Sequence, residues 1–236
     1  MCAAEMKMPG MASDLIMDLR GTLEWLKSEG DLMETDHPVD PDIELTAIQK
    51  NLDGSCPILF NNVKGKPDHR AVTNLFGDMN VVNKMFGWEN DTDRTIKLAY
   101  ALEHPLPPVE IGQDEAPCQE HVIENPADVN EFMVPIRHTE FEPELTVGSG
   151  NRVVAGKYFD GGTDLGYNRM NFRWGNVGTF QISPGSHMWQ VVSKHYKDDE
   201  PVPITMCFGL PPSCTLLAGA GFDLSLIHIS EPTRPY

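Results

Sequence analysis

The pattern of apolar and turn-forming residues changes at a proline-rich segment, residues 104–117, which holds four prolines among acidic side chains. Before it, helical and extended patterns alternate, which is typical of an α/β domain. After it, short strand-like runs are separated by glycine-rich turns, which is typical of a barrel or a sandwich. We therefore expect an α/β domain over residues 17–103, a linker over 104–117 and a mainly-β domain over 118–223.

In the first part, Asp18 is expected to cap a helix that ends near Gly30. A short extended piece at 32–34 leads to a second helix, which Asp40 would cap with Pro41 at its first position. The remaining expected elements are strands at 57–60 and 70–75 and helices at 81–86 and 93–103. In the second part, the expected elements are strands at 120–123, 152–159, 169–173, 178–183 and 204–208 and a helix at 187–195.

The net charge of −17 argues against nucleic acid and anionic membrane surfaces as partners, because both are polyanions. The five cysteines form no CxxC pair, which favours a reducing compartment. No run approaches the roughly 20 apolar residues of a membrane helix, and the first 17 residues lack the pattern of a signal peptide. A cytoplasmic protein is expected. Residues 1–16 form an extension of uncertain origin, because Met11 or Met17 could be the true start.

The stretch from Gly161 to Gln190 concentrates residues that can do chemistry. Asp164 and Arg169 are five residues apart, and His187 follows Asp164 by 23. An Asp and a His can hold a divalent metal, and an arginine offers a fork of donors to a phosphate. Simpler roles remain open: Asp164 could bond its own backbone in a Gly-Gly-Thr-Asp turn, Arg169 could form a surface ion pair, and His187 could be a partly buried polar residue.

Other residues of this region are expected to be structural. Arg173 would share a strand face with Arg169 and is expected to form a structural contact. His195 precedes a charged turn and is expected to be solvated. Trp174 and Trp189 are expected to pack in the core or at its rim.

The last thirteen residues, 224–236, resemble the read-through translation of a transposase adapter used in preparing sequencing libraries. We therefore expect Asp223 to be the last native residue and 224–236 to be a non-native tail.

Five motifs, in order, resemble the N-terminal part of the UbiD family of decarboxylases, which use prenylated FMN. They are Met17–Arg20 with the leucines that follow, the LFNNVKG run of Leu59–Gly65, the NLFG run of Asn74–Gly77, the YNRM run of Tyr167–Met170 and the PGSH run of Pro184–His187. The resemblance covers about residues 17–223. It implies that the second domain is an incomplete split β-barrel, similar to flavin reductases.

The resemblance also implies a site. Asp164, where the family has Asn or Asp, and His187 would bind a metal, typically Mn²⁺ beside K⁺, that reaches the phosphate of prenylated FMN. Arg169 would be catalytic and would contact the flavin, with Tyr167, Asn168, Met170 and His187 also at the cofactor. Asp at position 164 is similar to the branch that acts on hydroxybenzoates such as protocatechuate and gallate.

By this resemblance, the flavin carries the decarboxylation and a glutamic acid returns a proton to the substrate carbon. The family's catalytic glutamates and a further metal ligand lie beyond the position of Asp223. We therefore expect this chain to be inactive and its full-length parent to be a homo-oligomeric decarboxylase of a small aromatic acid, supplied with cofactor by a prenylated-FMN synthase. A non-catalytic flavin- or metal-binding module and a component of an aromatic carboxylase remain alternatives.

Overall fold

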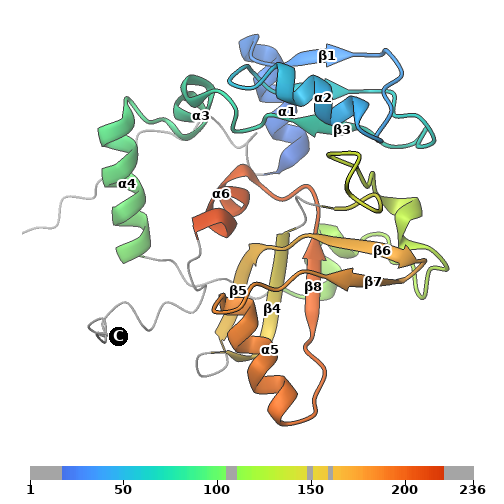
Figure 1. Ribbon diagram of the computed structural model, residues 1–236. Helices are drawn as coiled ribbons and strands as arrows, with labels where there is room; N and C mark the ends of the chain where they lie inside the picture. The colour runs from blue at the N-terminus through green and yellow to red at the C-terminus, as the bar shows by residue number, and fades with distance from the viewer. Residues whose placement is uncertain (1–17, 105–110, 148–150, 159–161, 221–236) are drawn as a thin grey trace, which may run out of the picture.

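The computed structural model describes residues 18–104, 111–147, 151–158 and 162–220 (Figure 1). An N-terminal unit contains helices around a three-stranded sheet. A second unit contains two antiparallel sheets and a long helix, and helix α6 (Pro212–Ala220) lies between the two units in Figure 1.

The first helix, α1 (Leu19–Glu29), begins and ends as its capping residues predict. The Asp18 carboxylate accepts the Gly21 N–H at 2.7 Å, and Gly30 ends the helix with a positive φ of 78°. Glycine adopts this left-handed conformation without the steric cost of a Cβ. The predicted helix is confirmed.

A three-stranded sheet forms the centre of the N-terminal unit, with β2 (Ile58–Phe60) between β1 (Met33–Thr35) and β3 (Ala71–Thr73). β2 runs parallel to β1 and antiparallel to β3. Successive strand side chains point to opposite faces. Leu59 packs with α1 and with α3 (Met79–Phe86), whereas its two neighbours on β2 pack with Leu45 of α2 (Glu44–Asn51). Both faces of this sheet are therefore covered, as in an α/β layered fold.

Helix α2 (Glu44–Asn51) starts later than the sequence predicts. The Asp40 side chain accepts the Asp42 N–H at 2.9 Å in a turn ahead of the helix, and no side chain caps the helix itself. The main chain of Pro41 and Ile43 instead exchanges hydrogen bonds with Arg137 of the second unit. The predicted cap at Asp40 is wrong because this long-range pairing holds residues 41–43 out of the helix.

Helix α4 (Asp91–Glu103) follows α3 and begins at Asn90, whose side chain accepts the Thr92 and Asp93 N–H groups. The predicted helices at 81–86 and 93–103 are thus confirmed, each starting two residues earlier. Figure 1 shows α4 standing apart from the sheet, and Ile96 on it is 62% exposed.

In the second unit, β4 (Asn151–Tyr158) lies between β5 (Gly162–Tyr167) and β8 (Ile204–Cys207), with antiparallel pairing to both. A separate hairpin joins β6 (Met170–Trp174) to β7 (Val177–Phe180). Helix α5 (His187–Lys197) packs beside β4.

The sequence predicts four strands and the long helix of this second unit to within a few residues, but other elements differ. No strand forms at 120–123, which is irregular. Short 3-10 helices lie on either side of it, at Gln113–Glu115, Pro117–Gln119 and Val129–Phe132. Two elements, β5 and α6, are not predicted from the sequence. The glycines of β5 are typical of turns. Pairing with β4 overrides the local preference of the β5 glycines.

The fold class is confirmed at the level of an N-terminal α/β unit followed by a sheet-rich unit. Over the described residues, the two sheets of the second unit do not close into a barrel.

The two units are joined by residues 134–147, which precede β4. Ile136 packs against the cluster around Phe60 and pairs with Thr146 in an isolated bridge. Arg137 forms a bidentate ion pair with Asp42, from Nε to Oδ1 at 2.6 Å and from Nη2 to Oδ2 at 2.7 Å. This loop carries side chains of the candidate site.

Candidate functional site

The predicted segment Tyr167–Met170 turns the chain from β5 into β6. The main chain of Met170 pairs with Val147, and the Arg169 carbonyl accepts the Gln181 N–H at 3.0 Å. The Asn168 amide donates to the Gln181 carbonyl at 2.6 Å. Gln181 lies six residues before His187. These hydrogen bonds therefore join the YNRM motif to the loop that leads to the PGSH motif.

Tyr167, the last residue of β5, also contacts α6. Its hydroxyl donates to the Thr215 carbonyl at 2.7 Å, and its ring lies close to Gly219. Helix α6 is thereby attached to the end of β5, next to Arg169.

The Arg169 guanidinium pairs with Glu142, from Nη1 to Oε1 at 3.0 Å. The other oxygen of Glu142, Oε2, accepts the backbone N–H of His138 at 2.6 Å and lies 3.1 Å from its ring Nδ1. The Glu142 side chain is 15% exposed and that of Arg169 is 49% exposed.

The environment of Glu142 favours its charged form. Partial burial raises the pKa of this carboxyl, but the hydrogen bonds from His138 and the charges of His138 and Arg169 outweigh that effect. The pKa of Glu142 therefore lies below the usual value of a glutamate, and the carboxylate is ionised at neutral pH.

A cleft of about 450 Å³ lies between the two units, and Arg169 and His138 line it. Its N-terminal wall comes from α1, α2, β3 and the NLFG motif. The full set of lining residues is Leu19, Gln49, Val72, Thr73, Asn74, Leu75, Phe76, Ile136, His138, Tyr167, Arg169, Gly209, Leu210 and Thr215. A cleft that combines apolar side chains with polar groups and one arginine suits a flat ligand that carries an anionic group.

Arg169 also borders a second hollow, of about 240 Å³, lined by residues of β6, β7 and the 142–146 loop. Glu142, Glu144 and Asn171 are among its lining residues. Arg169 therefore lines both cavities, and the Glu142 carboxylate that pairs with it lines the smaller one.

The predicted metal ligands lie on separate elements. Asp164 is on β5, paired with Val154, and not in the turn that the sequence suggests. Its side chain lies outside what the structure describes. His187 is the first residue of α5, where the Ser186 hydroxyl caps the helix by accepting the Trp189 N–H at 3.2 Å. Among the described side chains, no group of three or more His, Cys, Asp or Glu residues could hold a metal. The metal site therefore stays a prediction.

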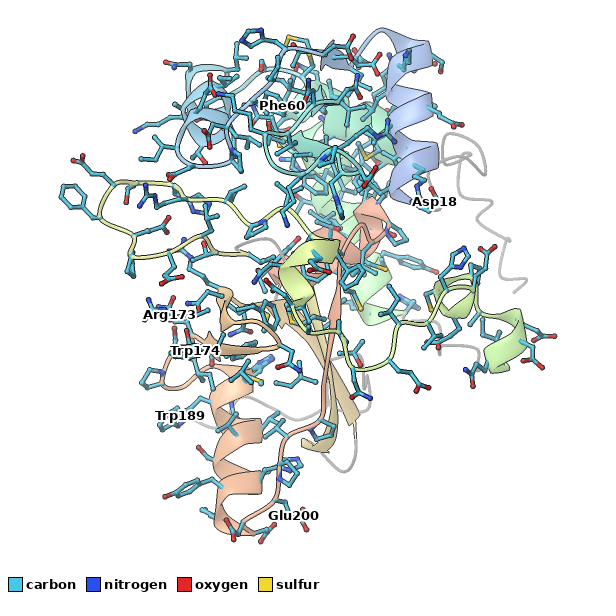
Figure 2. All side chains as sticks on the ribbon, turned by 90° about the vertical axis from the view of Figure 1, so that its right-hand side faces the viewer. Asp18, Phe60, Arg173, Trp174, Trp189 and Glu200 are labelled. Atoms are coloured by element: carbon cyan, nitrogen blue, oxygen red, sulfur yellow. The ribbon has the colours of Figure 1, made fainter. Side chains whose placement is uncertain are left out.

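Other expectations in this region have mixed outcomes. Arg173 pairs with Glu144 at 2.9 Å, a structural contact as expected, and stacks on Trp174 at 5.7 Å. Figure 2 shows Arg173, Trp174 and Trp189 on one side of the second unit, and the two tryptophans are 59% and 45% exposed rather than packed in the core. His195 is only 4% exposed, so the expectation that it is solvated is wrong. It lies on the face of α5 that turns towards the sheet, which a charged turn nearby does not reveal.

Sequence reasoning missed Glu142 and His138. Their spacing of four residues, in a segment that holds three glutamates, was a visible signal. Nothing local connects them to Arg169, which follows Glu142 by 27 residues. The predicted tail, residues 224–236, lies outside the described residues.

Comparison with known proteins identifies the family. The profile of the N-terminal domain of the 3-octaprenyl-4-hydroxybenzoate carboxy-lyase family, UbiD, matches residues 23–102, and that of its Rift-related domain matches residues 109–227. The gallate decarboxylase of Lactiplantibacillus plantarum is 28% identical over 237 residues, which cover 93% of this chain and 46% of that protein. The chain thus spans about half the length of the curated relatives it matches.

Solved structures agree with this fold. The UbiD-class enzyme HmfF from Pelotomaculum thermopropionicum, in an evolved dimeric form in complex with prFMN, superposes with a TM-score of 0.77 at 25% identity, over 84% of this chain and 45% of that one. The closed form of the vanillic acid decarboxylase of Sedimentibacter hydroxybenzoicus superposes with a TM-score of 0.80 at 22% identity, over 88% of this chain and 46% of that one.

Within the described ranges, no helix is long and apolar enough to cross a membrane. The resemblance inferred from the five motifs is confirmed over both units by the two family profiles. The chain belongs to the UbiD family of carboxy-lyases.

Proposed function

We propose that this chain carries the cofactor-binding part of a prenylated-FMN-dependent decarboxylase of aromatic acids, with a hydroxybenzoate as the expected substrate. The observation that carries the proposal is the half-exposed Arg169 on the wall of a cleft of about 450 Å³ that combines apolar and polar side chains. The gallate decarboxylase similarity supports the hydroxybenzoate branch. Because the chain matches about half of such relatives, the activity is proposed for the full-length protein.

The residues around Arg169 fit a flavin. Over the described residues, the Arg169 side chain donates a single hydrogen bond, so most of its five donor N–H groups are available to a ligand. The Asn168 side-chain oxygen is buried and accepts no hydrogen bond there, which leaves an acceptor for a ligand N–H. Tyr167, Met170 and His187 would complete the contacts. When bound, prenylated FMN would supply the electron sink for decarboxylation.

Arg169 would orient the carboxylate of the substrate or a polar edge of the cofactor by charge-assisted hydrogen bonds. Leu75, Ile136 and Leu210 would receive apolar surface and keep water from the cleft. Asp164 and His187 would hold Mn²⁺, with K⁺ nearby, at the cofactor phosphate. The position of His187 at the start of α5 supports this, because helix N-termini favour phosphate.

The sheets of the second unit would form part of a split barrel in the full-length protein. A homo-oligomeric, cytoplasmic enzyme that receives its flavin from a prenylated-FMN synthase is the corresponding cellular proposal.

Binding of FMN tests the cofactor half of this proposal in the chain itself. Quenching of flavin fluorescence is measured for the wild type, Arg169→Ala and the control Arg173→Ala, which removes the same charge four residues further along the chain. The expected result is binding by the wild type and the control, with binding by Arg169→Ala about tenfold weaker or more. Equal binding by all three proteins would show that Arg169 does not contact the flavin.

Decarboxylation is tested with the full-length parent, co-expressed with a prenylated-FMN synthase and given protocatechuate, gallate, vanillate and 4-hydroxybenzoate. Release of carbon dioxide from at least one of them is expected. Flavin binding without turnover of any acid in either direction would favour the non-catalytic module, and carboxylation alone would favour a carboxylase component. The same assay on the 236-residue chain tests the prediction that it is inactive by itself.

A further inference from the structure

We propose that Glu142 is a positioning residue that fixes the direction of the Arg169 guanidinium at the cleft between the two units. The inference rests on the proposed function, because it concerns how Arg169 meets its ligand. It concerns a carboxylate within this chain, which the motifs of the sequence did not point to.

Glu142 is itself held in place by its neighbours. Its Oε2 accepts two hydrogen bonds from His138, one from the backbone and one from the ring side. The Glu142 N–H donates to the Thr139 carbonyl at 3.2 Å, which closes the loop, and Ile136 and Thr146 pair at its base. These contacts hold the Glu142 carboxylate in place independently of its ion pair with Arg169.

These contacts leave one oxygen of Glu142 for Arg169. Oε1 accepts the Nη1 donor at 3.0 Å. Arginine side chains have large rotamer entropy, and Arg169 is 49% exposed, so it would otherwise sample many directions. A fixed acceptor on one nitrogen orients the whole planar guanidinium, and its other donors remain for a ligand. Such pre-organisation strengthens binding because less freedom is lost on association.

A competing explanation is that Glu142 merely neutralises Arg169. The two explanations predict opposite results for an anionic ligand. If Glu142 only neutralises, then Glu142→Ala frees a positive charge and binding becomes tighter. If Glu142 positions, then Glu142→Ala lets Arg169 move and binding becomes weaker.

The chain contains a matched control in the pair of Glu144 with Arg173, joined at 2.9 Å. Glu144→Ala changes the net charge by the same amount, two residues away. Glu144 lines the hollow of about 240 Å³ beside Glu142, but its ion pair is with Arg173 and not with Arg169. A difference between the two alanine variants therefore reports the direction of Arg169 and not the overall charge.

The direct experiment measures the order of the Arg169 side chain by ¹⁵N relaxation of its Nε–H group in the 236-residue chain. In the wild type and in Glu144→Ala we expect an order parameter near that of a rigid group, about 0.8. In Glu142→Ala we expect it to fall below about 0.6. Glu142→Gln keeps one acceptor oxygen and should lie between. It also serves if Glu142→Ala does not fold, which thermal unfolding will reveal.

The second readout is FMN binding by the same proteins. We expect Glu142→Ala to weaken binding about fivefold to tenfold and Glu144→Ala to change it less than about twofold. An unchanged order parameter in both Glu142 variants, or FMN binding as tight or tighter in Glu142→Ala, overturns the positioning role. If Arg169 loses order in Glu142→Ala but the wild type does not bind FMN, the positioning role stands and the proposed function fails.

Discussion

The ion pair between Asp42 and Arg137 gives a quantitative test of how the two units are held around the cleft. Its two hydrogen bonds, at 2.6 and 2.7 Å, have the bidentate geometry that makes such pairs strong. The side chains are 43% and 29% exposed, so solvent screens part of that strength. Exposed pairs contribute up to about 1 kcal/mol, and we expect a coupling free energy of about 1 kcal/mol here.

The measurement is a double-mutant cycle of Arg137→Met and Asp42→Asn, with free energies of unfolding from urea titrations. Methionine keeps much of the apolar stem, so the cycle isolates the charge contact. The pair of Arg94 with Asp91 is the control. It has one contact at 2.9 Å, and the Asp91 side chain is 80% exposed, so about 0.3 kcal/mol is expected.

The result also bears on the cleft. Arg137 lies between Ile136 and His138, which line the cleft, while its own main chain bonds to Pro41 and Ile43. Because those backbone bonds survive the substitution, FMN affinity should change less than about threefold in Arg137→Met. A coupling no larger than the control would show that the ion pair does not hold the units together. A coupling above about 3 kcal/mol would mean that the pair behaves as a buried one.

Three further predictions follow from individual contacts. A Cβ at Gly178 would lie 1.7 Å from the Asn171 carbonyl oxygen. Gly178→Ala should therefore lower the free energy of unfolding by about 2 kcal/mol or more, measured by urea unfolding, because it disrupts the β6–β7 hairpin. A change below about 0.5 kcal/mol would contradict the close approach. Folding lowers the pKa of Glu142, so the stability that its carboxylate contributes is present at neutral pH and is lost as the pH falls through that lowered pKa. The difference in free energy of unfolding between the wild type and Glu142→Gln should therefore shrink from about pH 6 to about pH 3. A pH-independent difference would rule this out. Burial, with smaller effects from nearby thiols, raises the pKa of Cys207. Iodoacetamide should therefore modify the exposed Cys118 well before Cys207, as measured by mass spectrometry of the peptides. The reverse order would mean that Cys207 is accessible.

Where the structural signal is contained in neighbouring residues, the sequence predicts the fold well. Helix α1 is bounded by Asp18 and Gly30, which act on the backbone within one turn of their own positions. The strand at 58–60 is predicted because a short run of apolar residues bounded by turn signals is typical of a buried strand.

The failures share a cause. The start of α2 depends on Arg137, almost a hundred residues later, and β5 forms because β4 lies beside it. The burial of His195 depends on which face of α5 packs inward. Each of these outcomes is set by a partner that is distant in sequence, so local propensity cannot report it.

For the candidate site too, some features are set by the sequence alone and others by the tertiary structure. The sequence by itself determined the family, because ordered motifs such as YNRM carry it without any coordinates, and it selected Arg169 as the residue most suited to the chemistry. Only the tertiary structure decided where Arg169 lies and what holds it: the cleft between the two units, and a Glu142 carboxylate fixed by His138. The physical reason is that a side chain's chemical type belongs to the residue, whereas its direction, burial and pKa belong to the groups that folding brings against it.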